Sequence, residues 1–495
     1  MKLNDFTIWQ GNFGLPEKIS DTESNFYDSS VIPFTDKVLF KNWNDKDFDK
    51  IDGDYKTNFV FIAPGLLCSK LEWDESRVTY YRKQDFHIIE DYFFSDIDRK
   101  NGVTLPHFGD KQLKTKLELR KYFSDIIGKD LFNSIESGKF TLIIDSHTEL
   151  ISKQFAETLI SLLEYVGLKN ICCLVYNTEN FKHPKVISWD YFLYSFIRDV
   201  KPIFEMSGYY PLSELNIDYL SQYKKPKRYL SYNANLHGHR LYSALSLYKK
   251  NLDEYGLISL LNRSEVPKDE LKSEIIQFLS HNGVGDYSGK DISDYDRSVA
   301  DLLDDYYPKF PITLDIDVDF LQGDDEIFKQ RLRDKYVFTQ EMESSIDGVR
   351  SDRFITIEHH LDTYFSIISE TSISNQHSDW DNDELVHICE KTFKGLASPH
   401  PFILFANNGV LKYLRSIGFE TFPEMFDESY DDEKDALKRF NLVLDEVERL
   451  SKMNIDEMHQ KFVNTLPKIK HNHELLLSFD REELLLNILK GISNV

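Results

Sequence analysis

The sequence predicts an α/β protein that folds as two domains followed by a helical tail. The chain has 495 residues, too long for one ordinary core, because domains commonly span roughly 100 to 200 residues. Short apolar runs alternate with segments of helical period along most of the chain, and a charged helical stretch closes it. With 41% hydrophobic residues, 15 Pro and 21 Gly, the composition supports packed cores and excludes a disordered or fibrous chain.

The first domain, residues 1–222, is predicted from a pattern of strand, helix and strand. Three apolar runs indicate buried strands: NFVFIAP at 58–64, FTLIIDSH at 140–147 and NICCLVYN at 170–177. Between the last two, apolar residues recur every three or four positions until Gly167, a typical helix stop. A helix between two buried strands indicates a parallel pair, because parallel strands need a long crossover connection.

The second domain, residues 223–432, is predicted from a further alternation of strands and helices. The basic, proline-interrupted segment KKPKRYL at 224–230 is typical of a linker between domains. The predicted strands after it are RYLSYNAN, YGLISLL, TYFSIISETS and PFILF, and HGHRLYSALSLYKKNL is a predicted amphipathic helix. Residues 433–495 are charged with a helical pattern, and we expect this tail to pack back on the domains.

Charge and cysteine content narrow the class of protein. The net charge of -24, from 83 acidic and 59 basic residues, disfavours non-specific nucleic-acid binding because the summed field repels phosphate backbones. The 4 Cys include the adjacent pair Cys172 and Cys173 and form neither a disulfide framework nor a metal-type spacing. Because no stretch reaches the roughly 18 apolar residues that span a bilayer, we expect no membrane span and a cytoplasmic protein.

Arg240 is the first candidate for ligand binding. The predicted strand ends near Asn233, a short loop containing Gly238 follows, and Arg240 falls in the first turn of the next helix. Free N–H groups at a helix start attract anions, and the guanidinium can grip phosphate oxygens with two donors. The alternative is a solvated Arg at a helix end, which is the ordinary place for this residue.

Glu390 and Lys391 form the second candidate. They open a predicted helix that leads into the buried strand PFILF, and ligands of open parallel sheets bind at the carboxyl ends of the strands. A Lys there can neutralise a diphosphate, and a Glu can accept hydrogen bonds from the hydroxyls of a ribose. The alternative is a surface ion pair without a ligand.

Three stretches resemble the donor-binding half of the α1,3-fucosyltransferase family: YLSYNANLHGHRLYSAL, YFSIISETS and ICEKTFKGLASPHPFILFANN. The run PFILFANNGVLKYLRSIGFETFPEMFDESYD also resembles uncharacterised glycosyltransferase-like proteins from phages and bacteria. The resemblance covers about residues 228–431. It implies a GT-B architecture, in which two Rossmann-like domains face a cleft and the C-terminal domain binds a nucleotide sugar without a metal.

The resemblance carries over to individual donor-binding residues. Its strand ending in Ser-Asn matches Asn233, its pyrophosphate-binding Arg matches Arg240, the carboxylate of its Phe-Glu-Asn-Ser motif matches Glu370, and its ribose and diphosphate contacts match Glu390 and Lys391. Here the second motif reads Ser-Glu-Thr-Ser, a Cys replaces the Thr before the Glu-Lys pair, and the polar insertion between the motifs is longer. The resemblance therefore implies an inverting glycosyltransferase without a cofactor, and leaves the sugar and the acceptor open.

A transferase of this kind needs a general base for the acceptor hydroxyl. The strand end LIIDSHTEL supplies Asp145, His147 and Glu149 in the first domain, and any of the three could take this role. The alternative is that Asp145 or Ser146 caps the following helix.

Two other classes compete with the transferase. PITLDIDVDFL places Asp315, Asp317 and Asp319 on one face of a strand, and with Asp145 and His147 these resemble the ligands of arginase-type and deacetylase-type metallohydrolases. The further Asp and His ligands of those enzymes are missing, and we expect no metal.

EHHLD at 358–362 is interpreted as a solvated turn because adjacent His side chains point apart. The third class is a GT-B-like binding or structural protein without catalysis.

Overall fold

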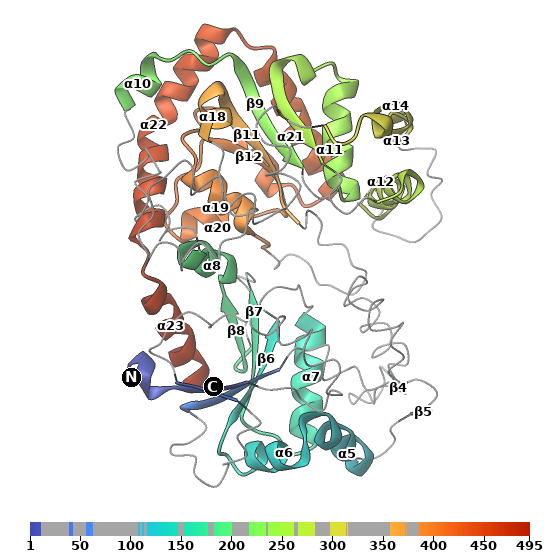
Figure 1. Ribbon diagram of the computed structural model, residues 1–495, viewed down its shortest axis with the longest axis vertical. Helices are drawn as coiled ribbons and strands as arrows, with labels where there is room; N and C mark the ends of the chain where they lie inside the picture. Colours follow the sequence, from blue (N-terminus) through green and yellow to red (C-terminus); the bar gives the residue numbers. More distant parts are fainter. Residues whose placement is uncertain are drawn as a thin grey trace. The chain divides into compact units, whose positions relative to one another are not determined.

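The computed structural model describes residues 1–10, 39–42, 56–62, 107–108, 111–112, 116–146, 153–176, 183–199, 217–233, 236–261, 266–282, 298–312, 314, 357–371, 373 and 386–495. In these residues the fold is α/β, with one parallel sheet in each of two compact units (Figure 1). Unit 1 comprises Met1–Tyr191, Asp379–Asp381 and Glu482–Val495, and unit 2 comprises Phe192–Ser378 and Asn382–Arg481.

Unit 1 contains a six-stranded sheet of order β2-β1-β3-β6-β7-β8, in which all neighbouring strands are parallel. Its strands are β1 (Thr7–Gln10), β2 (Leu39–Asn42), β3 (Asn58–Ile62), β6 (Thr141–Ser146), β7 (Ile171–Tyr176) and β8 (Val186–Trp189). A small antiparallel hairpin joins β4 (His107–Phe108) to β5 (Lys111–Gln112). The predicted strands near 58, 140 and 170, and the parallel pairing of the last two, are confirmed.

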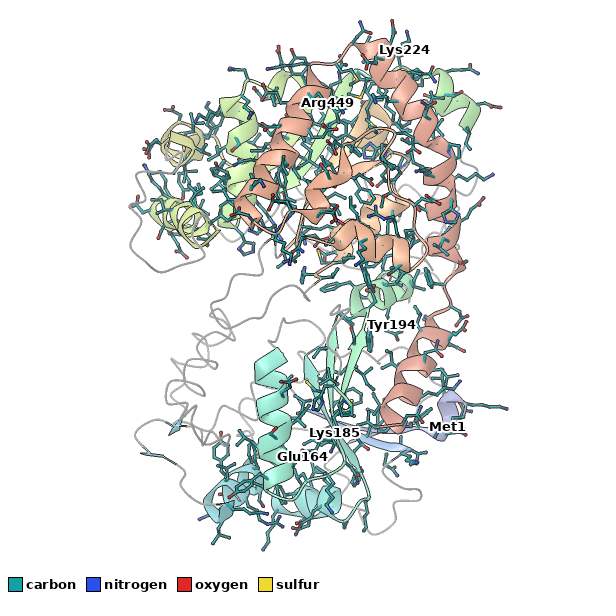
Figure 2. All side chains as sticks on the ribbon, turned by 180° about the vertical axis from the view of Figure 1, so that it is seen from behind. Met1, Glu164, Lys185, Tyr194, Lys224 and Arg449 are labelled. Carbon is teal, nitrogen blue, oxygen red and sulfur yellow. The ribbon has the colours of Figure 1, made fainter. Side chains whose placement is uncertain are left out.

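Three helices cover one face of this sheet: α5 (Lys116–Ile127), α6 (Lys129–Glu136) and α7 (Lys153–Tyr165). Alternate side chains of β3, β6 and β7 pack with side chains of these three helices in one buried cluster. This is expected, because successive side chains of a strand point to opposite faces of the sheet. Lys185, just before β8, forms an ion pair of 2.7 Å with Glu164 near the end of α7 (Figure 2). The last helix of the chain, α23 (Arg481–Ser493), also belongs to unit 1, where Ser493 Oγ donates to Lys56 O at 2.9 Å.

Unit 2 contains a four-stranded parallel sheet of order β10-β9-β11-β12. The strands are β9 (Lys227–Asn233), β10 (Gly256–Leu260), β11 (Thr363–Ser369) and β12 (Phe402–Phe405), close to where the sequence predicts them. The chain passes from β9 to β10 on one side, then returns to the other side of β9 to form β11 and β12. This reversal creates a topological switch point between β9 and β11, the place where open parallel sheets bind ligands beyond the carboxyl ends of their strands.

The longer helices of unit 2 pack on the sheet and on one another. Helix α11 (Gly238–Lys249) and helix α21 (Ala436–Ser451) contact each other and β9, while α19 (Glu390–Ala397) and α22 (Ile455–Ser478) contact each other and β11 (Figure 1). The remaining helices are α8 (Tyr191–Asp199), α10 (Ile217–Gln222), α12 (Lys268–Asn282), α13 (Ser298–Asp301), α14 (Leu303–Tyr306), α18 (Ile357–Asp362) and α20 (Val410–Ser416).

The boundary between the units differs from the predicted one. The first change of unit lies between Tyr191 and Phe192 rather than at 222/223, and the predicted tail divides, with α21 and α22 in unit 2 and α23 in unit 1. The basic segment at 224–230 is not a linker, because Lys225 is buried and its Nζ donates to His360 O and Leu361 O, each at 2.9 Å. Those carbonyls belong to the end of α18, so Lys225 binds a helix C-terminus inside the protein, although a basic segment is typical of a solvent-exposed linker.

The packing of β9 against β10 generates a prediction about Gly256. Gly256→Ala should destabilise unit 2 by about 1–3 kcal/mol through overpacking, because an added Cβ would lie 2.2 Å from Cε2 of Tyr229. The ring of Tyr229 is fully buried, and its hydroxyl is bonded to Leu252 O at 3.0 Å, so it has no free direction to move. Hydrogen exchange of the β9 and β10 peptides across a urea series measures the decrease in the free energy of unfolding.

The matched control for this variant is Lys412→Ala, an exposed position on α20 where the change in stability should stay within about 0.5 kcal/mol. Equal stability of Gly256→Ala and the control would contradict the packing described for Tyr229.

Candidate functional site

Two cations meet at the switch point of unit 2. Arg240 comes from the first turn of α11, which follows β9, and Lys391 comes from the first turn of α19, which precedes β12. Both donate to the hydroxyl of Thr371, just after β11: Arg240 Nη2 lies 3.3 Å and Lys391 Nζ 3.5 Å from Thr371 Oγ1. Thr371 is an exposed residue, so the two cations converge on a side chain at the surface. The expectation that Arg240 and Lys391 come together thus agrees with the geometry.

Glu390 lies beside Lys391 and forms an ion pair with it. Glu390 Oε1 is 2.9 Å from Lys391 Nζ, and the two side chains keep exposed fractions of 16% and 27%. Burial acts to lower the pKa of Lys391, but Cys389 and Glu390 raise it above its ordinary value. Burial also raises the pKa of the Cys389 thiol well above its usual range. Glu370 contributes to the raised pKa of Lys391 as well, after Cys389 and Glu390, while Arg240 acts to lower it.

Glu370 occupies a different position from the one that its motif implies. Its side chain is fully buried, and its carboxylate accepts hydrogen bonds from Cys389 N at 3.2 Å and from Thr392 Oγ1 at 2.5 Å. Both donors lie at the start of α19, so this carboxylate serves the N-terminus of a helix. It does not face the solvent at Thr371.

Asn233, the last residue of β9, is also enclosed. Its side-chain Nδ2 donates to Ser231 Oγ at 3.1 Å and to Ser259 O at 3.2 Å, and its backbone N donates to Ser259 Oγ at 3.3 Å. With an exposed fraction of 1%, Asn233 joins the end of β9 to β10. Among the described residues its Oδ1 has no hydrogen-bond partner.

Two histidines were missed as part of this site. His239 follows Gly238 at the start of α11, and its Nε2 lies 2.8 Å from Glu370 O, which ties the start of α11 to the end of β11. Burial, and after it the charges of Arg240 and Lys391, lower the pKa of His237 to about 4. The spacing in LHGHR, with two His residues just before the Arg, is the sequence signal that could have indicated them.

Arg439 was also missed, because it lies in the predicted tail. This side chain of α21 is buried, and its guanidinium donates to Ala406 O at 2.9 Å and to Ile373 O. These carbonyls follow β12 and β11, so Arg439 holds together the two loops that leave the carboxyl edge of the sheet. Burial lowers its pKa to about 10, at which it remains a cation at neutral pH.

Of the three candidates for a general base, only Asp145 lies within the described residues. Asp145 is the penultimate residue of β6 and is half-buried in unit 1. His147 and Glu149 lie outside the described residues, and so do the three carboxylates of the competing motif, Asp315, Asp317 and Asp319. Within the described ranges, no group of three or more His, Cys, Asp or Glu side chains is arranged to hold a metal ion.

The interpretation of EHHLD as a solvated turn is wrong. These residues lie in α18, and both histidines are buried. His359 Nδ1 lies 2.5 Å from Tyr232 Oη, and the His360 ring lies 4.7 Å from that of His400. Their polar atoms and rings are engaged within the protein, so this cluster is structural.

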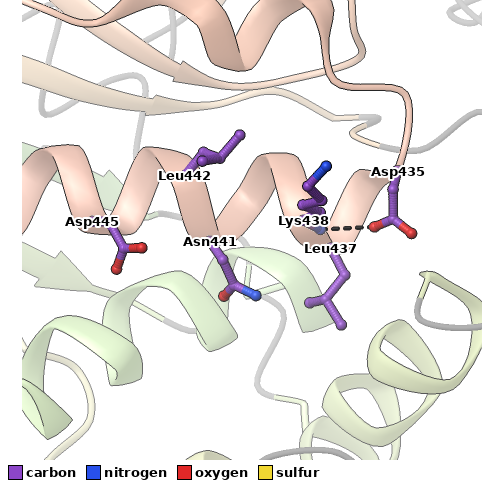
Figure 3. Close-up of a pocket in the computed structure, with 6 residues that line it drawn as sticks. All are labelled: Asp435, Leu437, Lys438, Asn441, Leu442 and Asp445. Atoms are coloured by element: carbon purple, nitrogen blue, oxygen red, sulfur yellow. Dashed lines mark hydrogen bonds between the residues drawn. The ribbon is translucent and has the colours of Figure 1, made fainter.

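A surface depression on α21 lies apart from these residues (Figure 3). Its lining comes from one helix and its cap, namely Asp435, Leu437, Lys438, Asn441, Leu442 and Asp445. Asp435 caps this helix by accepting from Lys438 N at 2.7 Å. A depression lined by one exposed helix face lacks the convergent polar groups of a ligand site, so Arg240, Thr371 and Lys391 remain the candidate site.

Comparisons of the chain with family models, curated proteins and solved structures find no match. None of the helices in the described part of the chain combines the length and apolar character needed to cross a membrane.

The convergence of charges generates a prediction about His237. Arg240→Ala should raise the pKa of His237 from about 4 toward its ordinary value, because it removes a positive charge that opposes protonation of the ring. Lys391→Ala should raise it as well, by a smaller amount. Titration of ¹³C-labelled histidines by NMR measures both shifts.

His473 is the control within the same spectra, because burial lowers its pKa to about 4 and neither cation contributes to that shift. A pKa of His237 that does not change in either variant would mean that the three groups are apart in solution.

Proposed function

We propose that this protein is a glycosyltransferase of GT-B type, which moves a sugar from a nucleotide-sugar donor to an acceptor hydroxyl. One observation carries the proposal: Arg240 and Lys391, from two different helices, donate to the hydroxyl of the same exposed residue, Thr371. That hydroxyl oxygen stands where an oxygen of a bound anion would accept from both cations. The point lies at the switch between β9 and β11, the preferred ligand position of such sheets.

The two cations suit a diphosphate better than a single carboxylate. A guanidinium offers a planar fork for two oxygens, while an ammonium acts as a compact charge that can serve a second phosphate. Glu390, adjacent and partly exposed, can accept hydrogen bonds from the hydroxyls of the attached ribose. One nucleoside diphosphate would therefore use all three side chains.

In the proposed reaction the acceptor oxygen attacks the anomeric carbon, and the bond from that carbon to the diphosphate breaks. Negative charge grows on the departing diphosphate, and Arg240 and Lys391 would stabilise it where it develops. The acceptor proton would pass to a general base, for which Asp145, His147 and Glu149 are the candidates from the sequence.

Nucleoside diphosphate binding tests the proposal directly. We expect UDP, GDP or ADP to bind the protein in isothermal titration calorimetry, and Lys391→Ala to weaken binding about 10- to 100-fold, the loss expected for a charged hydrogen bond worth about 1.5–3 kcal/mol. Arg240→Ala should weaken it at least as much, because two donors are lost. The matching nucleotide sugars are then tested for slow hydrolysis and for transfer to an acceptor panel.

Lys249→Ala is the matched control, since this exposed Lys lies at the opposite end of α11, roughly 14 Å from Arg240 at 1.5 Å per helical residue. It should bind as the unaltered protein does. Equal affinities for Lys391→Ala and Lys249→Ala would refute the site, and binding without hydrolysis or transfer of any nucleotide sugar would indicate a binding protein.

A further inference from the structure

Glu370 connects every element that contributes to the candidate site. Its backbone N donates to Phe405 O at 2.9 Å and so extends the pairing of β11 with β12. Its backbone O lies 2.8 Å from His239 Nε2, at the start of α11. Its carboxylate accepts from Cys389 N and from Thr392 Oγ1, at the start of α19. One residue after β11 thus holds both helices that supply the cations.

The carboxylate takes the place of a local cap on α19. The residue at the cap position, Cys389, makes no side-chain hydrogen bond to the helix N-terminus. A free N-terminus carries partial positive charge and unsatisfied N–H groups, and Glu370 supplies both a negative charge and an acceptor. Because a fully buried carboxylate is costly unless it is compensated, it constrains where the first turn of α19 can lie.

Among the described residues, no Lys or Arg forms an ion pair with this carboxylate. The ring of His387 lies beside it, with Nδ1 3.9 Å from Glu370 Oε2. Burial lowers the pKa of His387 to about 4, so the ring is neutral at neutral pH. Cys389 N and the Thr392 hydroxyl are therefore its hydrogen-bond donors, and the charge of Lys391 interacts with it from beyond ion-pair distance.

We propose that Glu370 is the positioning residue of the cation pair, acting on a ligand only through Lys391 and Arg240. Lys391 lies between the two positions that Glu370 fixes, Cys389 and Thr392, and its ammonium reaches Thr371, the residue next to Glu370. Arg240 follows His239, which is fixed by the carbonyl of Glu370. The part of this inference that concerns a ligand rests on the proposed function, whereas the part that concerns geometry does not.

The geometric part is tested without a ligand, through the thiol of Cys389. This thiol is 1% exposed and lies at the residue whose N–H Glu370 holds. In Glu370→Ala the first turn of α19 should open more often, and alkylation of Cys389, followed by peptide mass spectrometry, should accelerate about tenfold or more. Glu370→Gln, which keeps the shape and one acceptor, should restore most of the protection.

Asp431 provides a matched control, because it is another buried carboxylate at a helix N-terminus in the same unit. It accepts from Leu411 N at 3.1 Å and from Lys412 N at 3.0 Å, at the start of α20. Asp431→Ala should therefore leave the alkylation rate of Cys389 unchanged. Equal rates for Glu370→Ala and the unaltered protein would overturn the proposal, and so would equal acceleration by Asp431→Ala.

The ligand part is tested by a double-mutant cycle on nucleoside diphosphate affinity. If Glu370 acts through the cations, adding Glu370→Ala to Lys391→Ala should cost far less affinity than Glu370→Ala costs alone. Fully additive losses would show that Glu370 acts independently and would overturn that part. If the unaltered protein binds no nucleoside diphosphate, the proposed function fails, while the alkylation rates still decide whether Glu370 positions α19.

Discussion

The candidate site depends on one buried carboxylate, that of Glu370, held against the N-terminus of α19. In an open parallel sheet, the hydrogen bonds between strands end at the carboxyl edge, so they do not hold the loops beyond it together. Glu370 holds these segments together past that edge, because it is hydrogen-bonded to α11, α19 and the end of β12. Arg439 adds a second constraint on the same edge, from α21, by bonding the backbone after β11 and after β12.

The site is a local exception to the charge of the whole protein. A net charge of -24 repels anions at long range, so an anion site needs cations that act at short range and are little screened. Arg240 is 6% exposed and Lys391 is partly buried, which strengthens their effect on a group bound between them. The pKa of His237 is lowered first by burial and then by the charges of Arg240 and Lys391, so the ring stays neutral beside them.

The sequence was sufficient to predict what depends on local pattern. The apolar runs predict β3, β6, β7 and the strands of unit 2. Because parallel strands end at one edge of a sheet, the sequence also predicts that Arg240 lies near Lys391, as the structure shows. It failed where burial depends on distant partners. The basic segment that contains Lys225 predicts a linker and the adjacent His residues of EHHLD predict a solvated turn, but the end of α18 binds Lys225, and Tyr232 and His400 contact the two histidines. The assignment of Glu370 to donor binding rests on the resemblance of its motif, and only the tertiary position of α19 shows what its carboxylate faces.

The manner in which Glu370 is compensated matters for function. A buried carboxylate paired directly with Lys391 would cancel the charge that an anionic ligand needs, whereas backbone N–H and hydroxyl donors balance it and leave the ammonium to face Thr371. Glu390, not Glu370, is the carboxylate that forms an ion pair with Lys391, and it is partly exposed. Under the proposed function, a hydroxyl of the ligand would take over one of its contacts. The buried carboxylate of Glu370 thus holds the start of α19, while the partly exposed carboxylate of Glu390 stays at the surface, where the proposed ligand would bind.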